Sequence, residues 1–194
     1  MNLFGSGTRA SGQGLSLVST WMRQGVIRSI QTGSIDLNNV TSNTAPINVV
    51  NLANTVLISL GSRHNLGSSV SQTCTYHLQL TNSTTVTATR FTSDANTFAV
   101  GYAVVEFLPG IIRSVQSGTI ELNGSTSNTF PITAVNTAKA FVIHLGTRYN
   151  TVAAANVNQR DSILTLTNAT TVTASCFVDP GFSHLTSFMV VELF

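Results

Sequence analysis

Charge is the scarcest property of this sequence. Only 8% of the 194 residues are charged, the single lysine is Lys139, and the formal net charge is +2. An ordinary soluble domain carries about 25% charged residues. A nucleic-acid-binding protein needs clustered Lys and Arg side chains to neutralise phosphates, and the sequence has no such cluster. The composition therefore argues against nucleic acid as a partner.

Long apolar runs and export signals are also missing. The sequence has no run of about 18 apolar residues, as a membrane-spanning helix would need. Its N-terminus lacks the charged segment and continuous apolar segment of a secretory signal. We therefore expect no membrane as a partner, and assembly inside the cell that makes the protein.

Patterns that carry chemistry are sparse. The four histidines (His64, His77, His144 and His184) do not fall at metal-ligand spacings. No Gly-x-Ser-x-Gly motif is present, and the glycine pairs near residues 5 to 14 lack the flanking strand and helix of a phosphate-binding loop. We expect no enzyme activity, no metal and no cofactor.

An internal repeat dominates what is present. Gly25 to Asn38, GVIRSIQTGSIDLN, returns as Gly110 to Asn123, GIIRSVQSGTIELN, and 21 of the 37 positions from Gly25 to Gly61 are identical at an offset of 85. After a one-residue insertion the offset becomes 86, at which LTNSTTVTA matches LTNATTVTA. This predicts an N-terminal arm at 1–22, repeat 1 at 23–108 and repeat 2 at 109–194.

The cysteines do not follow the repeat. Cys74 falls opposite Arg160, and Cys176 falls opposite Arg90. A disulfide framework would have been duplicated with its unit, so we predict two free, buried thiols.

Both repeats have the pattern of an all-β fold. In repeat 1 we expect six strands near 26–37, 46–50, 55–60, 76–80, 84–91 and 98–108, with a bulge or bend at Gly33. Six short strands joined by polar turns predict an antiparallel β-sandwich. Only Pro109 and Gly110 join the two sandwiches, so we expect a rigid tandem.

The duplication predicts matching cores. Core positions should be shared as identities or near-swaps: Ile27 with Ile112, Ile58 with Ile143, Leu80 with Leu166, Val86 with Val172 and Tyr102 with Phe188. Burial should repeat in phase, and the copies should differ mainly at 63–75 and 148–161.

Half of the charges lie at duplicated positions. Arg28 matches Arg113, and Glu106 matches Glu192. Because each pair joins the first and last strands of its unit, we expect cross-strand ion pairs and not a catalytic site.

Two regions are candidates for partner contacts. The arm carries apolar residues that could dock on a neighbouring subunit or on its own first domain: Leu3, Phe4, Leu15, Leu17, Val18, Trp21 and Met22. The matching loops Arg63-His64-Asn65 and Arg148-Tyr149-Asn150 place Arg beside an aromatic ring and Asn, which could grip a glycan or a neighbouring backbone, or could pin their own loop.

These residues carry a resemblance. The unit G-[VI]-I-R-S-[IV]-Q-x-G-x-I-x-L, with L-T-N-x-T-T-V-T-A and the closing V-V-E-[FL], resembles a repeated β-domain of tailed-bacteriophage structural proteins, over residues 25–194. The strand order and length also resemble the sandwich of the H-type lectins, although no lectin sugar-binding motif is present.

The resemblance implies a phage virion structural protein. We expect a capsid decoration or cement protein that binds the head through its arm, bridges neighbouring subunits, and forms a homo-oligomer. Its partners would be the major capsid protein or tail proteins, and its location would be the virion, assembled in the host cytoplasm. The alternative is a tail-fibre or tail-tip receptor-binding module that uses the two Arg loops on a glycan.

Overall fold

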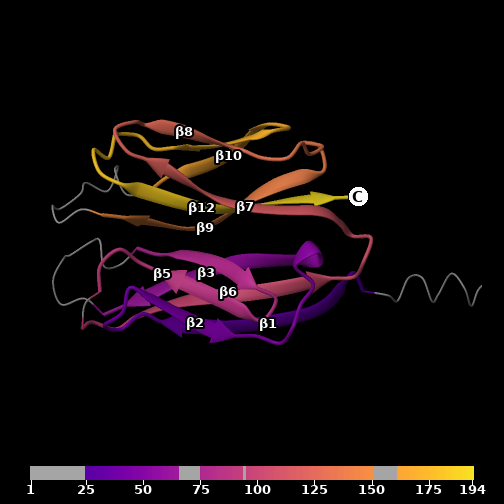
Figure 1. The fold of residues 1–194 in the computed structure, drawn as a ribbon, viewed down its shortest axis with the longest axis horizontal. Coiled ribbons are helices and arrows are strands. Elements are labelled where there is room, and N and C mark those ends of the chain that lie inside the picture. Colours follow the sequence, from indigo (N-terminus) through magenta and orange to yellow (C-terminus); the bar gives the residue numbers. More distant parts are fainter. Residues whose placement is uncertain (1–24, 66–74, 94, 151–160) are drawn as a thin grey trace, which may run out of the picture.

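The computed structural model describes residues 25–65, 75–93, 95–150 and 161–194, and this part of the chain is almost entirely β (Figure 1). Repeat 1 contains β1 (Ile27–Asp36), β2 (Ser42–Pro46), a 3-10 turn η1 (Leu52–Asn54), β3 (Thr55–His64), β4 (His77–Asn82), β5 (Thr85–Thr89) and β6 (Phe98–Phe107). Repeat 2 contains β7 (Ile112–Leu122), β8 (Ser127–Pro131), β9 (Ala140–Tyr149), β10 (Ile163–Asn168), β11 (Thr171–Ser175) and β12 (His184–Leu193). The all-β prediction is confirmed.

Each repeat is a sandwich of two three-stranded antiparallel sheets. The strand orders are β1-β6-β3 and β2-β5-β4 in repeat 1, and β7-β12-β9 and β8-β11-β10 in repeat 2. The order is therefore the same in both repeats, as the duplication predicts. The turn between β6 and β7 contains Pro109 and Gly110.

Side-chain alternation explains the sandwich core. In β5, Val86 and Ala88 are fully buried between threonines, and β11 repeats this with Val172 and Ala174. Because successive side chains of a strand point to opposite faces, a five-residue alternation is enough to choose which face turns inward. The preceding turn is closed by Asn82, whose side-chain oxygen accepts the Thr84 N–H at 2.9 Å.

Three local predictions are wrong. The third strand does not end at Leu60 but continues to His64, with an irregularity between Ser59 and Ser62. The second strand is Ser42–Pro46, not 46–50, because the chain leaves the ladder at Pro46. Val50 is nevertheless buried, so the apolar run that ends at Val50 packs against the core without forming a strand. The irregularity in β1 lies between Ile27 and Ser29, not at Gly33.

Gly33 and its counterpart Gly118 have another role. A Cβ atom on Gly33 would lie 2.6 Å from the Tyr102 hydroxyl oxygen. At Gly118 it would lie 2.8 Å from the Phe188 ring and 2.9 Å from the Phe130 ring. Each glycine lets an aromatic ring of the sandwich core lie directly against the backbone of the first strand.

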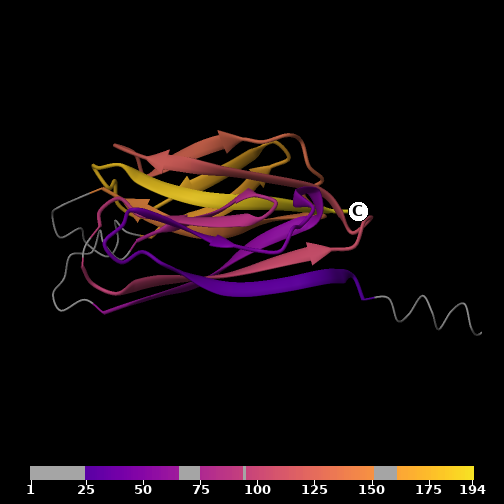
Figure 2. The ribbon, with the colours of Figure 1, turned by 60° about the horizontal axis from the view of Figure 1, so that its bottom comes forward.

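The two repeats pack against each other instead of hanging from a flexible joint. One apolar cluster contains the core of repeat 1 together with Ile112, Leu145, Met189 and Val191 of repeat 2. A second cluster, which includes Val190 and Phe188, fills the sandwich of repeat 2. The two units therefore share buried side chains, which favours the expected rigid tandem. Figures 1 and 2 show the sheet β7-β12-β9 lying between repeat 1 and the rest of repeat 2.

This packing breaks the predicted in-phase burial. Inner positions agree, because Leu37 and Leu122 are both fully buried. Outer positions disagree: Ile27 is 44% exposed, whereas Ile112 is 4% exposed. Ile27 is therefore not a core residue, because the outer face of its own sheet is not covered by the other repeat.

Three further points concern particular residues and segments. Cys176 is a free thiol, as predicted, but it is half-buried and not fully enclosed. Cys74, and the segments 66–74 and 151–160 where the copies were expected to differ, lie outside the described residues. Within the described ranges, no helix has the length and apolar character needed to cross a membrane.

The contact at Gly118 gives the first prediction. Gly118→Ala should lower the free energy of unfolding by about 1–3 kcal/mol, because its methyl group would overlap two aromatic rings. Gly25→Ala is the matched control, since nothing lies within 4 Å of the position its Cβ would take. Urea unfolding of both variants measures the difference, and equal stabilities would contradict the close-approach role.

Candidate functional site

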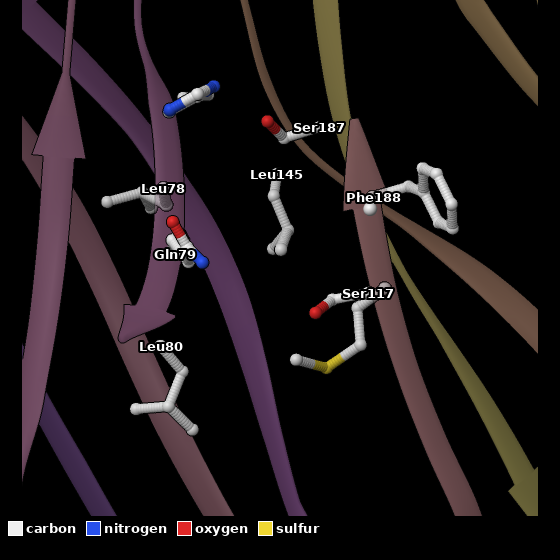
Figure 3. A pocket seen from close by; sticks show the side chains of 10 residues that line it. Leu78, Gln79, Leu80, Ser117, Leu145, Ser187 and Phe188 are labelled. Atoms are coloured by element: carbon white, nitrogen blue, oxygen red, sulfur yellow. The ribbon is translucent and has the colours of Figure 1, made fainter. Parts of the chain in front are cut away.

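The candidate site is the seam between the repeats, where a cavity of about 100 Å³ is lined from both sides. Figure 3 shows Leu78, Gln79 and Leu80 of β4 opposite side chains of β7, β9 and β12. The lining from repeat 2 consists of Ser117, Gly118, Leu145, Ser187, Phe188 and Met189, and His77 completes the lining from repeat 1. Pockets that take a small organic ligand usually enclose about 300–1,000 Å³, so this one has room for a few water molecules only.

His77 is the ionisable group of this cavity. Burial, with a smaller contribution from the nearby Arg148 charge, lowers its pKa from 6.5 to about 4. The His77 Nδ1 atom and the Arg148 Nε atom are both buried and have no hydrogen-bond partner among the described residues. A neutral imidazole beside a cation can accept a hydrogen bond from water in the seam, but the pair supplies no nucleophile.

Arg148 ties the two repeats together. Its guanidinium carbon lies 4.8 Å from the ring centre of Phe91, so a cation of β9 in repeat 2 stacks on an aromatic ring of repeat 1. The backbone contributes as well, because the Tyr76 N–H donates to the Thr147 carbonyl at 2.9 Å. The Met189 sulfur also accepts the Leu57 N–H at 3.5 Å.

The two partner loops predicted from the sequence occupy different environments. Arg63, His64 and Asn65 are all exposed at the end of β3. In the matching loop Arg148 is half-buried in the seam and Tyr149 is buried, with its ring 5.7 Å from that of Phe182. Asn150 is exposed, and its N–H donates to the Ser183 carbonyl. Only the repeat 1 loop presents all three side chains to a partner.

The seven apolar residues of the arm, from Leu3 to Met22, lie outside the described residues. Their predicted docking role therefore remains a prediction.

The duplicated glutamates serve the structure. Glu106 is 3% exposed and accepts from the Asn51 N–H at 3.0 Å and the Ser29 hydroxyl at 3.3 Å, and it pairs with Arg28 at 3.4 Å. The predicted ion pair between the first and last strands is therefore confirmed in repeat 1.

Glu192 repeats the arrangement in repeat 2. It accepts from the Asn136 N–H at 2.8 Å and the Ser114 hydroxyl at 3.1 Å, and it pairs with Arg113 at 3.9 Å. The hydrogen bond from Asn136 is the largest cause that lowers the pKa of Glu192, and the Ser114 bond and the Arg113 and Lys139 charges add to it. The carboxylate thus stays ionised at the end of the fold where the first and last strands of the repeat meet.

Arg90 has a structural role for which the sequence has no clear signal. Arg90 is 1% exposed, donates to the Leu37 carbonyl and, at 2.9 Å, to the Val40 carbonyl, and lies 5.5 Å from the centre of the Phe98 ring. It thereby holds the turn after β1. Repeat 2 has Cys176 at this place, so the mismatch between the two repeats is the only trace of this role that the sequence carries.

Metal chemistry has no assembled donor set here. No group of three or more His, Cys, Asp or Glu side chains comes together within the described ranges. His144 instead accepts the Gly146 N–H at 3.1 Å, and burial lowers its pKa, with Asp161 opposing the shift.

The chain matches no protein-family model, no curated protein and no solved structure.

The seam can be tested with a pair of glycines. Gly146 and its counterpart Gly61 both have positive φ, +107° and +90°, so a side chain at either costs about 1 kcal/mol. At Gly146 the added Cβ would also overlap the Tyr76 carbonyl oxygen, whereas nothing lies within 4 Å at Gly61. Gly146→Ala should therefore lose about 1–3 kcal/mol more unfolding free energy than Gly61→Ala in dilute protein. An equal loss in the two variants would mean that the seam does not form in solution.

The lowered pKa of His77 predicts that the free energy of unfolding depends on pH. Its folded pKa of about 4 lies below its ordinary value of 6.5, so the unfolded chain binds the proton more readily. The unfolding free energy should fall as the pH decreases from about 6.5 to about 4, by at most about 1.4 kcal/mol per pH unit, and this contribution should level off below pH 4. His77→Gln should flatten the slope in that window, and His64→Gln at an exposed position is the control. Parallel slopes for wild type and His77→Gln, measured by urea unfolding at several pH values, would contradict the buried neutral imidazole.

Proposed function

We propose that the chain is a phage virion structural protein, most plainly a capsid decoration or cement protein, which acts by binding other virion proteins. The observation that carries the proposal is the apolar cluster that joins two equivalent sandwiches into one rigid block. A rigid block with two similar lobes can hold a fixed spacing between neighbouring subunits of a shell, which a flexible pair of domains cannot.

The surface supports the same role. Exposed strand faces carry uncharged hydroxyl pairs, Thr81 with Thr87 in repeat 1 and Thr167 with Thr173 in repeat 2. These pairs make the sheet surfaces polar without adding positive or negative charge. Many identical copies on a symmetric particle can then bind stably through contacts that are individually modest.

The repeat pattern over residues 25–194 supplies the virion context, since it resembles β-domains of tailed-phage structural proteins. Under this proposal the apolar residues between Leu3 and Met22 contact the shell. The partner would be the major capsid protein.

The exposed Arg63-His64-Asn65 loop favours a second candidate, a tail-tip or tail-fibre module that binds a receptor glycan. An Arg beside an aromatic side chain and an Asn amide can hydrogen-bond and stack on a sugar. Because its counterpart Arg148 already stacks on Phe91, one loop per chain is available for this role. A glycan array with wild type and Arg63→Ala tests it, and binding that is lost in the variant would support the receptor role.

The decoration proposal is tested by removing residues 1–20. The shortened chain should stay folded, because the strands and the seam are built from residues after 24, but it should be absent from purified particles. Quantitative mass spectrometry of particles measures incorporation, and circular dichroism of the purified variant checks the fold. Incorporation equal to that of the full chain, or imaging that places the protein on the tail, would rule the decoration role out.

A further inference from the structure

The seam joins two different surfaces. Repeat 1 contributes its β3–β4 side, where Leu78 is 1% exposed and His77 is half-buried at the seam cavity, and we call this the covering side. Repeat 2 contributes the outer face of β7-β12-β9, with Ile112, Leu145, Met189 and Val191, and we call this the covered face. Since the two surfaces are unlike, the contact is head to tail and not two-fold symmetric.

Duplication leaves one copy of each surface without a partner in the chain. The counterpart of the covered face lies on β1, β3 and β6 of repeat 1, where Ile30 is 59% exposed and Leu60 is 58% exposed, against 2% for Leu145. We call it the open face. Figure 1 shows β1 on the side of repeat 1 that is turned away from repeat 2.

The counterpart of the covering side lies on β9 and β10 of repeat 2, and we call it the open side. Ile163 is 65% exposed there, whereas its counterpart His77 is half-buried at the seam cavity. We infer that a second copy of this chain docks its open side onto the open face, and so repeats between chains the contact that the seam makes within one chain.

The Arg–Phe pair of the seam is retained on the two open surfaces. Arg148 of the covered face stacks on Phe91 beside the covering side. Their counterparts are Arg63 and Phe177, the same two residue types, at offsets of 85 and 86. Arg63 is exposed and Phe177 is 89% exposed, although a phenylalanine ring gains most from being covered. A neighbouring chain would bring Phe177 beneath Arg63.

The backbone geometry of the seam is retained as well. Gly146 has a positive φ and leaves room for the Tyr76 carbonyl, and the Tyr76 N–H donates to the next residue on β9, Thr147. Gly61, the counterpart of Gly146, also has a positive φ. Nothing lies within 4 Å of its Cβ position, whereas the Tyr76 carbonyl fills the equivalent space at Gly146. The counterpart of Tyr76 is Ser162, which a second copy would place at Gly61.

Head-to-tail contacts add copies in one direction and yield a ring or a filament. This inference stands independently of the proposed virion role, because it concerns purified protein alone. Two blocked variants test it, Leu60→Asp on the open face and Ile163→Asp on the open side. Both residues are exposed in the single chain, so the variants should fold, and thermal unfolding checks this.

Light scattering after size exclusion should show wild type as a multiple of the 20.5 kDa chain, and each blocked variant as a single chain. An equimolar mixture of the two variants should form a dimer and stop there, because one intact face meets one intact side. Val49→Asp is the control and should assemble like wild type, since Val49 is 72% exposed and lies between β2 and η1, outside the strands that form the two surfaces.

Three results would overturn the inference. Wild type could remain a single chain, a blocked variant could still assemble alone as a two-fold contact would allow, or the mixture could stay monomeric because another segment covers the face. Arg63→Ala and Phe177→Ala provide a second measurement. Each single variant should weaken assembly by about three- to tenfold, because either change removes the Arg–Phe contact. The double variant should assemble about as well as the single variants, since both changes remove the same contact.

Discussion

Everything distinctive about this protein depends on the burial of one sheet face. The outer face of β7-β12-β9 would be half solvated in an isolated sandwich, but repeat 1 covers it, and its large apolar side chains join the core of the other repeat. Each such side chain contributes about 1.5–3 kcal/mol when it leaves water. The two repeats therefore share one apolar cluster, and the pocket, the buried His77 and the Arg148–Phe91 stack all exist because of this contact.

The same contact makes equal sequences unequal. Glu106 and Glu192 have matching partners because their environment is built within one repeat. Ile27 and Ile112 are identical residues at matching positions, yet only Ile112 is buried, because its surroundings come from the other repeat. A heterologous contact always leaves one copy of each surface at the two ends of the series. Ile30, Leu60, Ile163 and Phe177 are exposed on those two surfaces.

Much of the fold could be predicted from the sequence because its signals are local. The alternation around Val86 and Val172 predicts which faces of β5 and β11 are buried. The duplicated Arg and Glu residues predict the cross-strand ion pairs. The errors arose where one pattern has two physical causes. The apolar run that ends at Val50 packs without pairing, and Gly33 admits an aromatic ring instead of bending its strand.

The sequence by itself determined the repeat, the all-β class, and which residues could form pairs within a unit, because identical segments with alternating side chains reach the same local free-energy minimum. Only the tertiary structure decided which of two equivalent surfaces is covered, which Arg loop remains exposed, and where His77 meets Arg148. Those outcomes depend on contacts between residues far apart in the chain. The repeated sequence alone does not specify which copy of each surface will contact the other.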